Sequence, residues 1–235
     1  MRTSLIALAL GALLVGVAQG QDKAADQKRA DAAAQQNARG AALLKDGKLE
    51  DAVLELQKAA EAVPASAVFQ SNLAYAYDRQ GRIDDALAAY RKVLELDPAN
   101  AIARNNLANL YSKKGLYEDA VREFEDVLQR DPANATARTN LENATRSKAI
   151  AQERQDQIAV ALKGAAATPN DPRAAYEAAR VYARLGDADN AFVWLTNALD
   201  LGYDRIEYLR VDPSLTSLKT DPRFMKLLEE RRPQR

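Results

Sequence analysis

The chain has 235 residues, enough for one or two domains, and its 33 basic residues balance its 33 acidic ones. It contains no cysteine and no histidine, so ordinary zinc sites and most pairs of a nucleophile and a base are excluded. The balanced charge gives no basis for binding to nucleic acid. Its glycines stand singly, so no phosphate-binding glycine loop is present. We therefore expect a protein that is not an enzyme and that uses no cofactor.

Residues 1–20 have the pattern of a secretory signal peptide. Arg2 precedes an apolar run over residues 5–17, and small residues at positions 18 and 20 suit cleavage before Gln21. The alternative is a membrane anchor, but this run is shorter than the roughly 20 apolar residues of a spanning helix. We predict a cleaved signal, no stable membrane span after cleavage, and a periplasmic or secreted protein. Cleavage removes one charged residue, Arg2, and leaves 32 basic and 33 acidic residues.

Two segments of 34 residues, 67–100 and 101–134, match position by position. The matching residues include Asn72 and Asn106, Leu73 and Leu107, Ala74 and Ala108, Tyr77 and Tyr111, Gly81 and Gly115, Ala86 and Ala120, Tyr90 and Phe124, and Pro98 and Pro132. A fixed period of this length indicates a repeat architecture.

Each segment is expected to form two helices. Asn100 is a favourable N-cap for a first helix, because its side chain can accept a hydrogen bond from a free backbone N–H. Gly115 ends that helix, since glycine adopts the left-handed conformation without steric cost. Acidic residues open the second helix, where they complement the positive helix end, and Pro132 follows its end. Small residues such as Ala108 and Ala120 allow the two helices to approach closely.

This spacing resembles the tetratricopeptide repeat (TPR) family. Its 34-residue unit has small residues at positions eight and twenty, aromatic residues at eleven and twenty-four, and proline at thirty-two. One departure is the fourth position, usually a large aromatic residue, which is Gln70 or Arg104 here. The resemblance implies an all-α fold, a TPR α-solenoid of antiparallel helix pairs with a helical C-terminal cap.

The rest of the chain extends this organisation. Residues 135–171 open like a fourth copy, but no glycine stands at the expected turn, and Pro132 and Pro169 are 37 residues apart. Two interpretations remain, one long connecting helix, which we favour, or a degenerate helix pair. The predicted organisation is therefore a signal peptide at 1–20, three TPR units within 21–134 (33–66, 67–100 and 101–134), the connecting segment 135–171, a further unit at 172–205, and a cap and tail at 206–235.

In the TPR family the first helices of successive units line a concave groove. The resemblance therefore implies that a row of asparagines, one repeat apart, faces this groove. Each amide offers two donors and an acceptor, so a row can pair with the backbone of an extended peptide. An equally good interpretation is that asparagine is a soluble choice on an open helix face, copied by duplication. The predicted peptide-binding residues are Asn37, Asn72, Tyr75, Asn105, Asn106, Asn109, Lys113, Asn140, Asn143 and Arg146.

The sequence thus predicts a non-enzymatic protein–protein interaction module that binds a protein or an extended peptide in the concave groove. The alternative is a structural scaffold subunit of an envelope or secretion assembly. Neither function involves a metal or a cofactor.

Overall fold

The computed structural model describes residues 2–231, with side chains from residue 23 onward, and all its regular elements in this range are helices. The predicted signal peptide, residues 1–20, lies where side chains are not described. Within residues 2–231, none of the helices combines the length and the apolar composition that crossing a lipid bilayer requires. The chain forms two compact units, residues 1–145 and 146–235.

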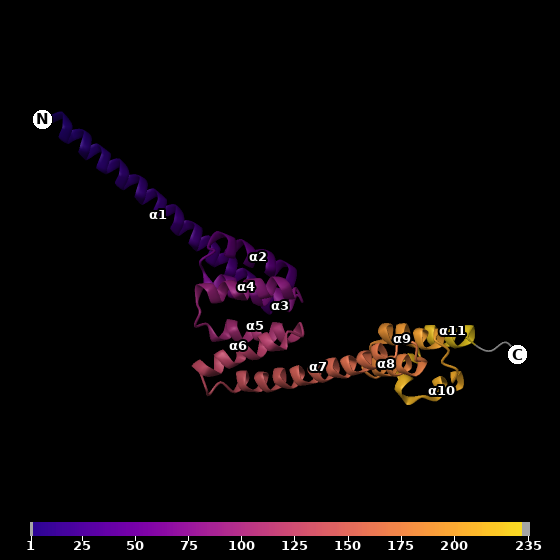
Figure 1. Ribbon diagram of the computed structural model, residues 1–235. Helices are drawn as coiled ribbons and strands as arrows, with labels where there is room; N and C mark the ends of the chain where they lie inside the picture. Colours follow the sequence, from indigo (N-terminus) through magenta and orange to yellow (C-terminus); the bar gives the residue numbers. More distant parts are fainter. Residues whose placement is uncertain (1, 232–235) are drawn as a thin grey trace. The chain divides into compact units, whose positions relative to one another are not determined.

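The first unit is built from three antiparallel helix pairs and the start of a seventh helix (Figure 1). The pairs are α1 (Arg2–Lys45) with α2 (Leu49–Ala62), α3 (Ala67–Arg79) with α4 (Ile83–Leu96), and α5 (Ala101–Lys113) with α6 (Tyr117–Arg130). Contacts between α2 and α3 and between α4 and α5 stack the pairs. The helices α3 and α4 lie within residues 67–100, and α5 and α6 lie within residues 101–134. The helix α1 begins well before residue 33, where the first repeat was predicted to start.

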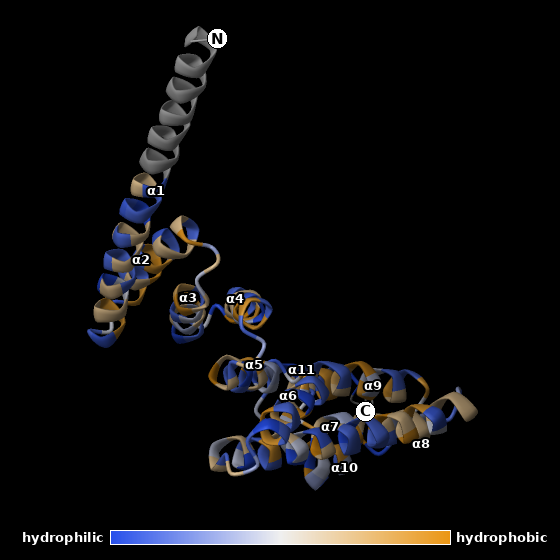
Figure 2. Cartoon of the chain, turned by 90° about the vertical axis from the view of Figure 1, so that its left-hand side faces the viewer, coloured by the Kyte–Doolittle hydropathy of each residue, from blue (hydrophilic) through white to orange (hydrophobic). Residues whose placement is uncertain are grey.

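The helix ends form as the sequence signals predict. The side chain of Asn100 accepts a hydrogen bond from the backbone N–H of Ala103 at 2.9 Å, and Ser66 and Asn134 cap their helices in the same way. Gly81 and Gly115 both have φ of 75°, the left-handed conformation that ends a first helix. In Figure 2, α4 carries hydrophilic and hydrophobic residues around its axis, and its apolar residues are the buried ones.

Small residues lie where the paired helices cross. Ala74, Ala86, Ala108 and Ala120 are fully buried. In the first pair this position is Gly40, where a Cβ atom would lie 2.5 Å from the Cγ atom of Leu56. Large side chains, including Tyr90 and Phe124, then fill the space beside the crossings.

The fourth-position residues, which depart from the TPR pattern, bind the preceding loop. The side chains of Gln70, Arg104 and Arg138 donate to the carbonyl oxygens of Pro64, Pro98 and Pro132 at 3.4, 3.1 and 2.6 Å. A polar contact thus takes the place of the aromatic residue, and it recurs once per repeat.

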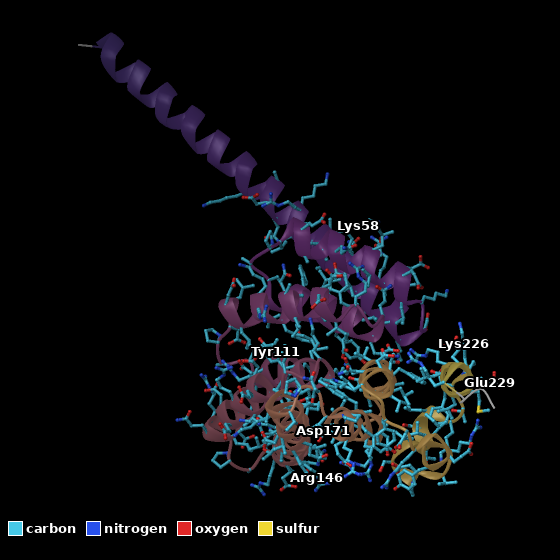
Figure 3. All side chains as sticks on the ribbon, turned by 45° about the vertical axis from the view of Figure 1, so that its right-hand side comes forward. Lys58, Tyr111, Arg146, Asp171, Lys226 and Glu229 are labelled. Carbon is cyan, nitrogen blue, oxygen red and sulfur yellow. The ribbon has the colours of Figure 1, made fainter. Side chains whose placement is uncertain are left out.

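A second recurring contact joins the second helix of one pair to the first helix of the next. Gln57 of α2 donates to the hydroxyl oxygen of Tyr77 at 2.8 Å, and Arg91 of α4 donates to that of Tyr111 at 2.9 Å. Tyr111 is labelled in Figure 3, among the packed side chains of the first unit. The aromatic eleventh position therefore serves both core packing and the junction between pairs.

The seventh helix, α7 (Ala135–Ala167), runs through the segment for which a long helix and a helix pair were both possible. Glu142 and Thr145 stand where α5 has Ala108 and Tyr111, one repeat earlier. A hairpin here would lack the small residue at which the other pairs cross and the large apolar or aromatic residue beside it, so the helix continues.

The second unit contains the last part of α7, one helix pair and a cap (Figure 1). Its elements are α8 (Pro172–Arg184), α9 (Ala188–Asp200), α10 (Ile206–Val211), the 3₁₀ helix η1 (Pro213–Leu218) and α11 (Pro222–Glu230). Its core joins the pair to the cap through residues that include Tyr176, Leu195, Leu209, Leu215, Leu218, Phe224 and Leu228. Aspartates cap α8, α9, η1 and α11, each accepting from a backbone N–H.

Asp212 is fully buried between the pair and the cap. Its carboxylate accepts hydrogen bonds from the Tyr176 hydroxyl and, at 2.7 Å, from the Ser214 backbone N–H, and it lies 3.2 Å from the Arg180 guanidinium. Burial alone would raise the pKa of Asp212, but these hydrogen bonds and the Arg180 charge together lower it below 3.8. The same burial and contact with Asp212 raise the pKa of Tyr176. Asp212 is therefore an ionised anchor for the cap.

Replacement of Gly81 by alanine should lower the free energy of unfolding by about 1 kcal/mol. No atom would crowd the new Cβ, so the cost comes from the left-handed backbone alone. Gly164→Ala is the matched control, because it lies inside α7, is equally uncrowded, and should stabilise by about 0.5–1 kcal/mol. Urea unfolding followed by far-ultraviolet circular dichroism measures both, and equal signs would contradict the prediction.

Asp212→Asn should destabilise the second unit by about 2 kcal/mol at neutral pH, because charge-assisted hydrogen bonds are lost. Trp194, the single tryptophan, lies in this unit and reports its denaturant unfolding by fluorescence. Because the pKa of Asp212 is lowered, its contribution is present above pH 3.8 and is lost as the pH falls from there through the native pKa. Asp204→Asn, at an exposed position, is the control. A difference between native and variant that did not shrink below pH 3.8 would contradict the prediction.

Candidate functional site

The predicted peptide-binding residues lie on α1, α3, α5 and α7. Nine belong to the first unit, and Arg146, labelled in Figure 3, is exposed at the start of the second. We call the side of α1, α3, α5 and the start of α7 that carries these nine residues the first-helix face. Six asparagines on it are half-buried: Asn37, Asn72, Asn105, Asn106, Asn109 and Asn140.

Asparagine side chains on neighbouring first helices form hydrogen bonds with each other. Asn72 donates to the side-chain oxygen of Asn37 at 2.8 Å, which joins α3 to α1. Asn140 donates to Asn105 at 3.4 Å, which joins α7 to α5. Both bonds span 35 residues, one repeat plus one position. These asparagines therefore hold successive repeats together. This role differs from the predicted peptide binding, and its sequence signal is the 35-residue separation of the two asparagines in each pair.

Asn106 has a different partner. It donates to the Tyr90 hydroxyl oxygen of α4 at 3.0 Å. Burial raises the pKa of Tyr90 to about 12, although the hydrogen bond from Asn106 opposes this rise. The tyrosine is thus neutral at physiological pH, and its hydroxyl remains a dipolar partner for the amide.

The charged and aromatic residues of the face are also engaged. Lys113 forms an ion pair with Asp78 of α3 at 2.5 Å. The Tyr75 hydroxyl accepts from Arg79 at 3.0 Å, and the Arg79 guanidinium lies 5.7 Å from the centre of the same ring. A ligand carboxylate at Lys113 would have to compete with Asp78.

The side-chain amides of two asparagines, Asn109 and Asn143, remain available for hydrogen bonds to a partner. Among residues 23–231, the side chains of Asn109 and Asn143 have no hydrogen-bond partner, and Asn72, Asn106 and Asn140 each donate one bond of the two that an amide can give. The face therefore still presents amide donors and acceptors to a partner.

Apolar side chains lie beside these amides. Val68 is 63% exposed and Ile102 is 74% exposed, at equivalent positions of successive repeats. Ile102, Asn106, Asn109 and Lys113 follow at intervals of three and four residues, so they share one side of α5. Val68 and Ile102 are not among the residues predicted from the sequence, although an apolar residue at the second position of two successive repeats was a signal for them.

Comparison with known proteins agrees with this architecture. A family model described as TPR repeat matches residues 79–115, and one described as Tetratricopeptide repeat matches residues 101–130. Residues 79–130 therefore consist of tetratricopeptide repeats, and the fold class predicted from the sequence is confirmed. No curated protein matches the sequence.

The solved structures that the chain resembles come from several organisms. The second TPR domain of human RPAP3, in complex with the HSP70 peptide SGPTIEEVD, is 25% identical with a TM-score of 0.47, over 51% of this chain and 98% of that one. The Sgt2 TPR domain from Aspergillus fumigatus is 20% identical with a TM-score of 0.48, over 52% of this chain and 82% of that one. MamA from Desulfovibrio magneticus RS-1 is 21% identical with a TM-score of 0.49, over 73% of this chain and 95% of that one.

The hydrogen bond between the side-chain amides of Asn37 and Asn72 predicts an energetic coupling between the two residues. In a double-mutant cycle with alanine at each position, the coupling energy should be about 1 kcal/mol, the usual net contribution of one hydrogen bond. Asn37→Ala combined with Asn109→Ala is the control and should be additive, because no hydrogen bond joins those residues. Additive effects for Asn37 and Asn72, measured by urea unfolding, would show that the hydrogen bond between their side chains does not stabilise the junction of the two repeats.

Proposed function

We propose that the first unit binds an extended segment of another protein on the first-helix face, without catalysis. The observation that carries this proposal is the exposure of Val68 and Ile102 at equivalent repeat positions beside amides with unused donors. Exposed apolar side chains gain free energy when a partner covers them, and contiguous ones mark interaction sites.

The chemistry of the face suits a backbone rather than one particular side chain. Amides can donate to and accept from a peptide main chain in any sequence, whereas the apolar side chains favour apolar residues at intervals along it. Concave surfaces built from successive repeats are the usual binding surfaces of solenoid proteins. Binding of a protein segment is also the general role of tetratricopeptide repeats.

We further propose that this binding takes place outside the cytoplasm, in the periplasm or after secretion. The support is the sequence pattern of residues 1–20, a basic residue, an apolar run and small residues before Gln21. Mass spectrometry of the protein purified from its native host tests this, since an N-terminus at Gln21 is expected.

The alternative function, a scaffold subunit of an envelope or secretion assembly, is favoured by a second surface. A groove of 460 Å³ lies between α1 and α2, and Leu54 at its edge is 53% exposed. Arg39, Asp46, Asp51 and Glu55 surround it. A permanent neighbour could cover this end of the array while the first-helix face stays free.

A variant with Val68→Asp and Ile102→Asp separates the two functions. In a pull-down from envelope extract, we expect at least a tenfold loss of the partner that the native chain retains, because two carboxylates would be buried at the contact. Val193→Asp in α9, 63% exposed, is the matched control and should retain the partner. Equal capture by all three proteins would move the function away from the first-helix face and favour the scaffold.

A further inference from the structure

The second unit has an apolar groove of 710 Å³ between the last turns of α7 and the helix α8. Its floor consists of small or apolar residues, Val160, Ala161, Gly164 and Ala165 from α7 and Ala174 and Val181 from α8. Val160 is 73% exposed. The groove is separate from the first-helix face, since all of its lining residues belong to the second unit.

The repeat register explains why the groove is there. Counted back from the proline that ends each unit, Gln157, Ala161 and Gly164 occupy the positions of Ala120, Phe124 and Val127 in α6. In α6 these three residues are fully buried. The end of α7 thus lies at the register of a second helix, but it lacks the large side chains of one.

This part of α7 also lacks the first helix that every other second helix packs against. The helices α2, α4, α6 and α9 are each paired with α1, α3, α5 and α8 in turn. Because α7 does not turn back, no helix among residues 2–231 pairs with residues 157–164 as a first helix pairs with a second. The groove has the position of a missing helix rather than that of a small irregular cavity.

Charged residues around the groove are mostly acidic. Glu153, Asp156 and Glu177 line it, against one basic residue, Arg184. Glu153 accepts a hydrogen bond from Gln157 and Asp156 accepts one from Gln152, so neither carboxylate is neutralised by these partners. Glu177 pairs with Arg180 at 2.7 Å. A partner that brings positive charge to the α7 side would be attracted.

We propose that this groove binds one amphipathic helix of another protein, with bulky apolar side chains on one face and basic residues beside it. The small floor residues leave room for large side chains, which the partner has to supply. Helix-in-groove binding of this type uses apolar residues three and four positions apart as anchors.

The chain's own sequence does not provide this helix. Residues 135–149 have the register of the missing helix, but Glu142 and Thr145 stand at its small and aromatic positions. Ala137 and Ala144 of the same segment are already buried in the first unit. In a second copy of the chain, residues 135–149 carry the same polar residues, and the apolar face of a first helix such as α5 is already buried through Leu107, Leu110 and Tyr111. The occupant is therefore a different protein.

A synthetic peptide with the sequence of residues 101–113 is a suitable probe, acetylated and amidated, with a helix-stabilising staple on its polar side. It is a first helix of this chain with Leu107, Leu110 and Tyr111 on one face, and its charged residues are Arg104 and Lys113. Fluorescence anisotropy should show binding to the full chain, and replacing both basic residues by glutamate should weaken it about tenfold, since each attraction becomes a repulsion.

Two variants of the full chain test the location. Ala161→Phe places an aromatic ring in the groove, as Phe124 does at its position, and should weaken binding of the peptide at least tenfold. Ala159→Phe is the matched control, because it is exposed on the same helix outside the groove. The exposed pair Glu153→Lys and Asp156→Lys gives an independent test, and should reverse the preference toward the glutamate peptide.

Several outcomes would overturn the proposal. They are no binding of the peptide, equal binding to Ala161→Phe and the native chain, or no change of preference with the two lysines. Binding of a fluorescent fatty acid that Ala161→Phe abolishes, with no binding of the peptide, would show a small-molecule pocket instead. The Val68→Asp and Ile102→Asp variant tests the proposed function of the first-helix face, and its result does not depend on whether the groove of the second unit binds the peptide.

Discussion

The close approach of two helices at a pair of small residues is the contact on which the architecture depends. Ala74 and Ala108 are fully buried, and at the equivalent Gly40 a Cβ atom would lie only 3.2 Å from the backbone oxygen of Ala52 in α2. This short distance allows larger residues such as Tyr90 and Phe124 to pack around the crossing rather than within it. Where these small residues are replaced, as by Glu142, the chain no longer folds back and α7 continues as one helix.

That replacement has effects in two places. In the first unit, the start of α7 covers the last pair through Leu141 and Ala144, so it closes the array. In the second unit, Ile158 and Leu162 contact the core formed by α8, α9 and the cap. The polar stretch between them, including Gln152 and Glu153, is exposed and is supported by side-chain bonds four residues apart. One helix therefore completes two cores and leaves one groove uncovered.

The sequence was sufficient for the helix pairs, since their signals are local and repeated. Caps, turn glycines, small residues and terminal prolines each act within one unit, and the structure places them where these rules predict. The function of the asparagines was harder to predict, because a polar residue on a helix can face solvent or a neighbouring helix. Asn72 and Asn140 bond to other asparagines, and this partner choice depends on the stacking of two units. The same limit applies to Asp212, whose position before Pro213 is a local capping signal but whose contacts with Tyr176 and Arg180 come from another element.

The contacts between units also determine how the chain can acquire its fold. The hydrogen bonds from Gln70, Arg104 and Arg138 to the preceding loop span six residues, those to Tyr77 and Tyr111 span 20, and the amide bridges span 35. Each helix pair is therefore completed by contacts with its immediate neighbour, which gives low contact order and rapid folding. Structure can begin at any pair and spread in either direction, as in other one-dimensional repeat arrays. A segment that emerges gradually, during synthesis or during passage through a membrane pore, can then fold pair by pair before the remainder of the chain is present.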